Sequence, residues 1–91
     1  MELDKSFGKA LRSLREAKGL NQQAFVDAVQ REHVSRLERG KSTPNLALID
    51  RLAGVLDVHP LSLLTSCYQI KENSSLEDLI ERVRLDLKGH E

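Results

Sequence analysis

Ninety-one residues, 40% of them hydrophobic and 31% charged, are enough for one small globular domain with a modest core and an appended helix. Aromatic residues make up only 3%, which argues against a platform for stacking single-stranded bases, and the single Cys67 excludes an internal disulfide. The formal net charge of zero predicts weak non-specific binding to nucleic acid. Because no apolar run is long enough to span a bilayer and no signal peptide is visible, we expect a cytoplasmic protein.

The first predicted element is a helix over residues 3–18. Its apolar side chains recur at helical spacing: Leu3, Phe7, Leu11 and Leu14. Gly19 follows, at the position where helices commonly end in a left-handed residue. A second helix is expected after Asn21, whose side chain can cap it by accepting from a backbone N–H. The buried side of this second helix would come from a short apolar run: Ala24, Phe25, Val26, Ala28 and Val29.

The chain is organised around residues 30–41, QREHVSRLERGK, which we call the recognition segment. Val34 and Leu37 are its only aliphatic residues, and their spacing of three makes a narrow apolar seam on one side of a short helix. The rest of that helix carries long hydrogen-bonding side chains, and Gly40 marks its end. Such a helix is suited to contact something polar and anionic, and the major groove of DNA is wide enough to admit it.

The charge distribution agrees with this interpretation. Residues 1–42 hold nine Lys or Arg against six Asp or Glu, a net +3, whereas residues 43–91 hold five against eight, a net −3. The positive excess therefore lies in the half of the chain that contains the recognition segment.

Two core helices are predicted after the recognition segment. Pro44 suits a helix start, with Thr43 or Asn45 as its cap. The apolar stripe that follows has the i, i+3, i+4 spacing of a core helix: Leu46, Ile49, Leu52, Ala53 and Leu56. A turn at residues 57–60 leads to a fifth helix, whose apolar side chains are Leu61, Leu63 and Leu64.

The chain resembles the phage-repressor/Cro (XRE) family of helix-turn-helix regulators. Three runs carry the resemblance in the family's order: Gly19-Leu20-Asn21-Gln22-Gln23, then VSRLERGK, then Pro44-Asn45-Leu46. The resemblance covers about residues 7–64. It implies an all-α fold with a lambda-repressor-like five-helix DNA-binding domain over residues 1–66. An extra C-terminal helix is expected to follow this domain.

The chain departs from the family pattern just before the recognition segment. No glycine lies between Gly19 and Gly40, and the stretch from Gln22 to VSRLERGK is two residues shorter than usual. Either the second helix loses half a turn, or its connection to the recognition helix is tighter than is usual in the family. Val26 stands where the family has a small residue and could fill part of the space opened by the shortening, and Gln30 is a poor N-cap.

Residues near the start of a recognition helix enter the groove most deeply, which makes Arg31, Glu32 and Arg36 the candidates for reading base edges. An arginine can pair with guanine O6 and N7, and a carboxylate can accept from cytosine N4. The alternatives are exposed arginines without a partner and, for Glu32, a local ion pair with Arg36 at i+4.

A second set of residues is expected along the phosphates, where contacts fix register without reading sequence. These residues are Gln22, Gln30, His33, Ser35, Arg39, Lys41 and Ser42. Gln22 belongs to the set because a first-turn amide and free backbone N–H groups can hold a phosphate, as the matching glutamine does in the family. No metal or cofactor is expected, since His33 has no histidine or cysteine near it in sequence. The resemblance also implies a structural ion pair between Arg15 and Glu38 that locks the first helix to the recognition helix.

The C-terminal part lies outside the family core. Residues 67–74 are predicted to form a polar connector, and Ser74 with Glu77 has capping-box spacing for a last helix over residues 75–91. The apolar residues of this helix repeat at helical spacing: Leu76, Leu79, Ile80, Val83 and Leu87. We expect it to pair with its copy in a second subunit, because DNA recognition independently favours two-fold symmetry. The rival is a helix that packs on its own domain.

These features predict a sequence-specific DNA-binding transcriptional regulator that binds an inverted-repeat operator as a homodimer. Repression is the commonest outcome that the resemblance implies, with activation as the other. The alternative is an antitoxin or another protein-interaction module with the same fold. An enzyme is not expected, because the sequence has no Gly-rich phosphate loop, paired metal ligands or nucleophile–base arrangement, and no small-molecule ligand is indicated.

Overall fold

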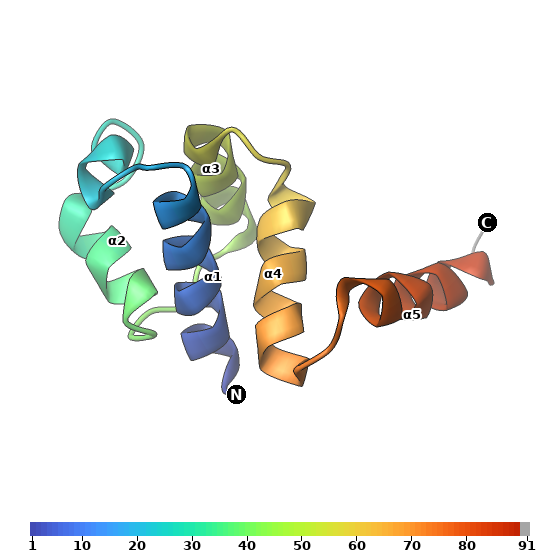
Figure 1. The fold of residues 1–91 in the computed structure, drawn as a ribbon. Coiled ribbons are helices and arrows are strands. Elements are labelled where there is room, and N and C mark those ends of the chain that lie inside the picture. Colours follow the sequence, from blue (N-terminus) through green and yellow to red (C-terminus); the bar gives the residue numbers. More distant parts are fainter. Residues whose placement is uncertain (90–91) are drawn as a thin grey trace.

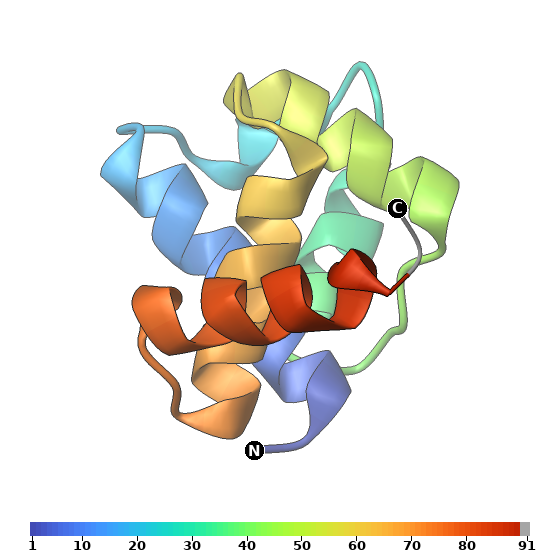
Figure 2. The same ribbon diagram turned by 90° about the vertical axis from the view of Figure 1, so that its right-hand side faces the viewer.

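The computed structural model describes residues 1–89, in which the chain forms five α-helices, one 3-10 helix and no strand (Figure 1). The elements in chain order are α1 (Leu3–Ala17), η1 (Gln22–Phe25), α2 (Arg31–Glu38), α3 (Leu46–Leu56), α4 (Pro60–Glu72) and α5 (Leu76–Lys88). The predicted all-α fold is confirmed. The elements up to α4 form one body in which α1 and α4 lie side by side, and α5 projects from it (Figure 2).

One core runs through this body, and every element up to α4 contributes to it. Its fully buried side chains include Leu11, Phe25, Val34, Leu37, Leu52, Leu56, Leu63 and Cys67. A helix that buries one face must carry apolar residues every three or four positions, which is why the spacing located α1, α2 and α3. Leu61 is an exception to this pattern. The sequence predicts it as an apolar residue of a core helix, but it stands in the first turn of α4 with 63% of its surface exposed.

The second predicted helix is reduced to the single 3-10 turn η1. Asn21 caps this turn as expected, with its Oδ1 accepting from the backbone N–H of Gln23 at 3.0 Å. A stretch that is two residues short holds too little chain for both an α-helix and a turn, so residues 26–30 form the connection to α2. Phe25 is fully buried and Val29 is nearly so.

Val26 does not fill the space opened by the shortening. Its side chain is 49% exposed, and Ala24 is also exposed, so the prediction that both belong to the buried side is wrong. The tighter winding of a 3-10 turn carries Val26 to the solvent side, while Phe25 and Val29 remain directed at the core.

Asn45 is the cap of α3, with its Oδ1 accepting from the backbone N–H of Leu48 at 2.8 Å. The Thr43 hydroxyl instead donates to the carboxylate of Asp4 at 2.8 Å. The prediction that Leu46 belongs to the core stripe is wrong, since 77% of its surface is exposed. Leu46 stands in the first turn at the edge of the stripe, and Leu48 at the opposite edge is the one that is buried.

α4 is longer than predicted. The segment 67–74, predicted as a connector, is helical as far as Glu72 and leaves the helix at Asn73, whose φ is +52°. The apolar stripe of α4 continues into this segment, because Cys67 is buried and Ile70 packs against the core. Burial also raises the pKa of the Cys67 thiol.

α5 is capped one residue later than the predicted pair of Ser74 and Glu77. The Oγ of Ser75 accepts from the backbone N–H of Asp78 at 3.1 Å. None of the residues Leu76–Lys88 is buried, and the main neighbour of α5 is α4. Figure 1 shows α5 at the opposite end of the molecule from α2, along a longest dimension of 41 Å. No helix within residues 1–89 has the length and apolar character to cross a membrane.

Candidate nucleic-acid interface

α2 is held in place by its two predicted seam residues. Val34 and Leu37 are fully buried, whereas Gln30, before the helix, makes no capping side-chain bond. α1 passes behind the last turn of α2 and approaches it closely at Gly8. A Cβ atom at Gly8 would meet the carbonyl oxygen of Leu37 and lie 2.7 Å from that of Glu38. Only glycine allows α1 to come this near to the backbone of α2.

Arg15 and Glu38, the predicted structural pair, are in contact from α1 to α2. The Nε of Arg15 donates to Oε2 of Glu38 at 2.7 Å and its Nη2 donates to Oε1 at 2.8 Å, while Nη1 donates to the Leu20 carbonyl oxygen at 2.9 Å. Only 11% of the Arg15 side chain and 4% of the Glu38 side chain are exposed. The bond to Glu38 raises the pKa of Arg15. A bidentate pair of this kind neutralises the carboxylate inside the protein, so it does not repel phosphates.

Gln22 joins this buried pair. Its Nε2 donates to Oε1 of Glu38 at 3.1 Å, which ties η1 to the last turn of α2. A primary amide has two N–H groups, so one remains available while the other is held by Glu38. The sequence placed Gln22 among the phosphate contacts without indicating this bond.

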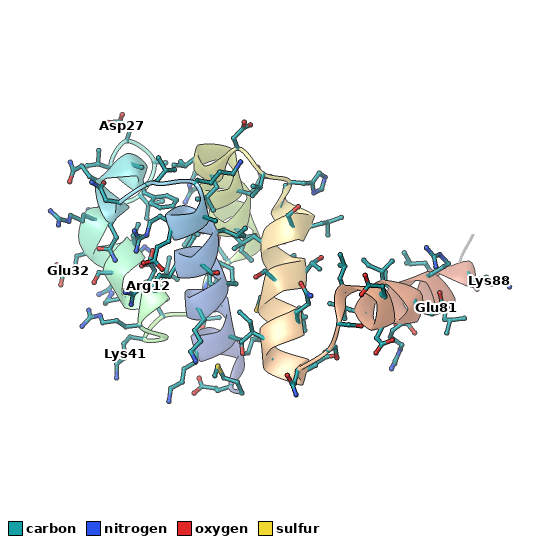
Figure 3. The ribbon with its side chains drawn as sticks, viewed as in Figure 1. Arg12, Asp27, Glu32, Lys41, Glu81 and Lys88 are labelled. Carbon is teal, nitrogen blue, oxygen red and sulfur yellow. The ribbon has the colours of Figure 1, made fainter. Side chains whose placement is uncertain are left out.

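The outer face of α2 carries half of the candidate DNA contacts, including all three base-reading candidates. At about 100° per residue, five polar side chains fall within an arc of about 140°: Arg31, Glu32, Ser35, Arg36 and Arg39. The three base-reading candidates are exposed, and Figure 3 shows Glu32 projecting away from the body of the protein. The buried seam lies on the opposite side of the helix. His33 is half-buried at the edge of the arc, next to Leu37 in the helical projection.

The chain after α2 continues the polar surface. Gly40 has a φ of +74°, and a Cβ atom on it would lie 2.7 Å from Cγ of Lys5, so the turn is packed against α1. Lys41 is exposed and projects from the same end of the molecule as Glu32 (Figure 3). Ser42 is half-buried. Residues 31–41 therefore present four cationic side chains with one exposed carboxylate, since the second is paired inside the protein.

Two structural supports of α2 were missed at the level of sequence. Gly8 could have been noticed, because a glycine in the interior of a helix costs about 1 kcal/mol and so needs a reason. The bond from Thr43 to Asp4, which ties the turn after α2 to α1, has no sequence signal because the two residues are 39 positions apart.

A helix-turn-helix family model matches residues 11–63, a stretch that runs from α1 into α4 and contains the whole of α2. The chain belongs to the helix-turn-helix family, of the phage-repressor/Cro (XRE) type. It is a DNA-binding transcription regulator.

One solved structure shares the fold of this helix-turn-helix regulator over nearly its whole length. It is the clp gene regulator ClgR from Corynebacterium glutamicum, with a TM-score of 0.72 and 25% sequence identity. The similarity covers 94% of this chain and 95% of the ClgR chain, so it extends beyond the family match into α5. No curated protein matches the chain.

Proposed function

We propose that the chain is a sequence-specific repressor that binds an inverted-repeat operator as a homodimer, with α2 of each subunit in the major groove of one half-site. The observation that carries this proposal is the outer face of α2. A short helix with a two-residue seam holds a polar arc outward, and the buried pair of Arg15 and Glu38 supports it from behind. A recognition helix needs such rigid support, because a base contact depends on side-chain placement within fractions of an ångström.

Within this face, Arg31, Glu32 and Arg36 would meet base edges. Each is exposed, and each lies in the first two turns of α2, the part of a recognition helix that enters the groove. The two arginines suit guanine and the carboxylate suits the cytosine amino group.

The phosphate contacts would come from residues at the rim of the arc and around the two ends of α2: Gln22, Gln30, His33, Ser35, Arg39, Lys41 and Ser42. Gln22 is the one with a fixed geometry, because its bond to Glu38 sets the position of its free N–H group. Such contacts would hold the register of α2 on the duplex without reading its sequence.

The homodimer would be made through α5, whose apolar side chains are left exposed by the body: Leu76, Leu79, Ile80, Val83 and Leu87 are exposed or half-buried. A dimer would place two copies of α2 in successive major grooves about 34 Å apart. The similar ClgR chain is a clp gene regulator, which supports a role in transcription for this chain.

Selecting bound duplexes from a random pool tests the proposal. We expect an enriched inverted repeat whose half-site centres lie about 10–10.5 base pairs, or a multiple of this spacing, apart. In transcription in vitro from a promoter that carries the selected site, we expect less transcript as protein is added. A single unrepeated motif would overturn the homodimer, and a rise in transcript would make the protein an activator.

A further inference from the structure

Apart from Leu85, the exposed large apolar residues of α5 form a continuous seam. Leu76, Ile80, Val83 and Leu87 are spaced by four, three and four residues, which is the heptad spacing of a coiled coil. Their side chains remain 46%, 39%, 42% and 52% exposed, respectively. Leu79, one position to the side, is half-buried, and it lines the groove between α4 and α5 together with Ile80 and Val83 of the seam. The seam therefore borders α4, but over its exposed side it lacks a partner within residues 1–89.

α5 needs such a partner to be stable. Isolated helices shorter than about 12–15 residues are marginal in water, and most helices in proteins are stabilised by packing an apolar face. α5 has 13 residues, none of which is buried. A second helix laid along the seam would supply the missing contacts.

The charges of α5 indicate what that second helix is. The first half of the helix carries Glu77, Asp78 and Glu81, and the second half carries mainly cations: Arg82, Arg84 and Lys88 with one Asp86. In an antiparallel pair, the cationic half of each α5 would lie beside the acidic half of the other. A copy running in the same direction would place like charges together. α5 is thus complementary in charge to its own antiparallel copy.

We propose that α5 of two subunits pair antiparallel along this seam, with Glu77 of each opposite the partner's Arg84. The proposal rests on the homodimer proposed above and adds its arrangement. In the heptad, Ile80 and Leu87 take position a, Leu76 and Val83 take position d, and Glu77 and Arg84 both take the flanking position e. Residues at e face the same position of an antiparallel partner, so two Glu–Arg contacts form across the dyad.

Arg84 is free to make this contact. Its present partner is Glu81 on the same helix, at 2.8 Å, with 68% of the Arg84 side chain and 55% of the Glu81 side chain exposed. Exposed pairs of this kind add little stability, so little is lost when Arg84 also meets a second carboxylate.

A charge-reversal experiment on the full-length chain tests the arrangement. Glu77→Lys and Arg84→Glu should each weaken the dimer by about tenfold, because each turns two attractive contacts into repulsive ones. An equimolar mixture of the two variants should form heterodimers well above the random proportion, because both contacts are attractive again. Effects within one helix are the same in the homodimers and the heterodimer, so they cannot produce this preference.

Asp78→Lys is the matched control. Asp78 lies next to Glu77 in the first turn of α5 and carries the same charge, so both substitutions reverse a negative charge at the same helix end. Asp78 takes heptad position f, which points away from the seam, so the dimer constant should stay near the wild-type value. The proportions are read by native mass spectrometry and the dimer constants by sedimentation equilibrium, with helix content followed by circular dichroism.

Three outcomes would overturn the arrangement: a wild-type chain that stays monomeric, random proportions in the mixture, or an Asp78→Lys effect as large as that of Glu77→Lys. A monomeric wild-type chain would mean that the seam binds a different protein. Heterodimer preference in a chain that binds no duplex would instead overturn the regulatory function and leave the pairing intact. Binding to a two-fold site without heterodimer preference would overturn the antiparallel pairing and leave the regulatory function intact.

Discussion

At the scale of single residues, the most informative side chain is Glu38. A carboxylate in a helix that faces DNA would oppose phosphate binding if it were exposed, yet here it is 4% exposed and held by Arg15 and Gln22. A buried charge is costly unless it is paired, so these three side chains fix the position of α2 relative to α1 and η1. The pair therefore specifies geometry more than it adds net stability.

Arg15→Met should lower the free energy of unfolding by about 3 kcal/mol, because it leaves the carboxylate of Glu38 buried without a partner. Arg15→Met combined with Glu38→Gln should recover part of the loss, since the charge is removed. Urea denaturation measures both values.

Arg12→Met is the control for that substitution. Arg12 also carries an ion pair on α1, to Glu16 at 3.5 Å, but its side chain is 64% exposed, so the expected change is below about 1 kcal/mol. Equal losses for Arg12→Met and Arg15→Met would show that the buried pair has no special role.

At the scale of the elements, the close approach of α1 and α2 depends on Gly8. Gly8→Ala should lower the free energy of unfolding by about 2 kcal/mol, although alanine favours helices, because the added methyl group meets two backbone carbonyl oxygens that cannot move aside. Gly54→Ala, in the interior of α3, should raise it by about 0.5–1 kcal/mol, since nothing lies within 4 Å of the added Cβ atom. Thermal and urea unfolding of the two variants compare these signs directly, and a gain in stability for both would show that α1 and α2 are not in contact at Gly8.

The sequence predicted the elements whose signals are local. The spacing of Val34 and Leu37 located α2, and the caps Asn21 and Asn45 lie where their side chains predicted. Predictions that depend on what a helix packs against were less accurate. Leu46 fits the apolar stripe of α3 but stands at its exposed edge, and Cys67 lies in a segment that looks polar yet is carried into the core by α4.

The candidate site divides in the same way. Exposure of Arg31, Glu32 and Arg36 follows from the helical period once the seam is known, so it could be predicted. The bond from Gln22 to Glu38 could not, because it depends on the reduction of the second helix to η1, which brings two residues 16 positions apart into contact.

At the scale of the whole molecule, two surfaces lie at opposite ends of its long dimension. α2 presents the cationic face, and α5 presents the exposed seam (Figure 1). The opposite net charges of the two halves of the chain correspond to this division, since the positive half contains α2. In the proposed dimer, this arrangement would separate the contact with DNA from the contact between subunits.

Removal of the chain from Leu76 onward should convert the protein to a monomer without unfolding it, because α5 contributes no buried residue to the core. Affinity for an intact inverted repeat should fall by about a hundredfold, since the second half-site is no longer bound within the same molecule. Sedimentation gives the mass, and titration of a labelled duplex gives the affinity. An unchanged mass would place the subunit contact elsewhere on the protein.

The most direct test of the central claim, that the outer face of α2 reads base edges, compares Arg36→Ala and Arg39→Ala on a selected duplex and on a scrambled one. Arg36→Ala should weaken binding to the selected duplex by about tenfold to a hundredfold and change binding to the scrambled duplex little, because a base contact is lost. Arg39→Ala should weaken both about equally and lower the salt dependence by about one unit, as the loss of a phosphate contact does. If the two substitutions acted alike on both duplexes, α2 would not be the element that reads the sequence.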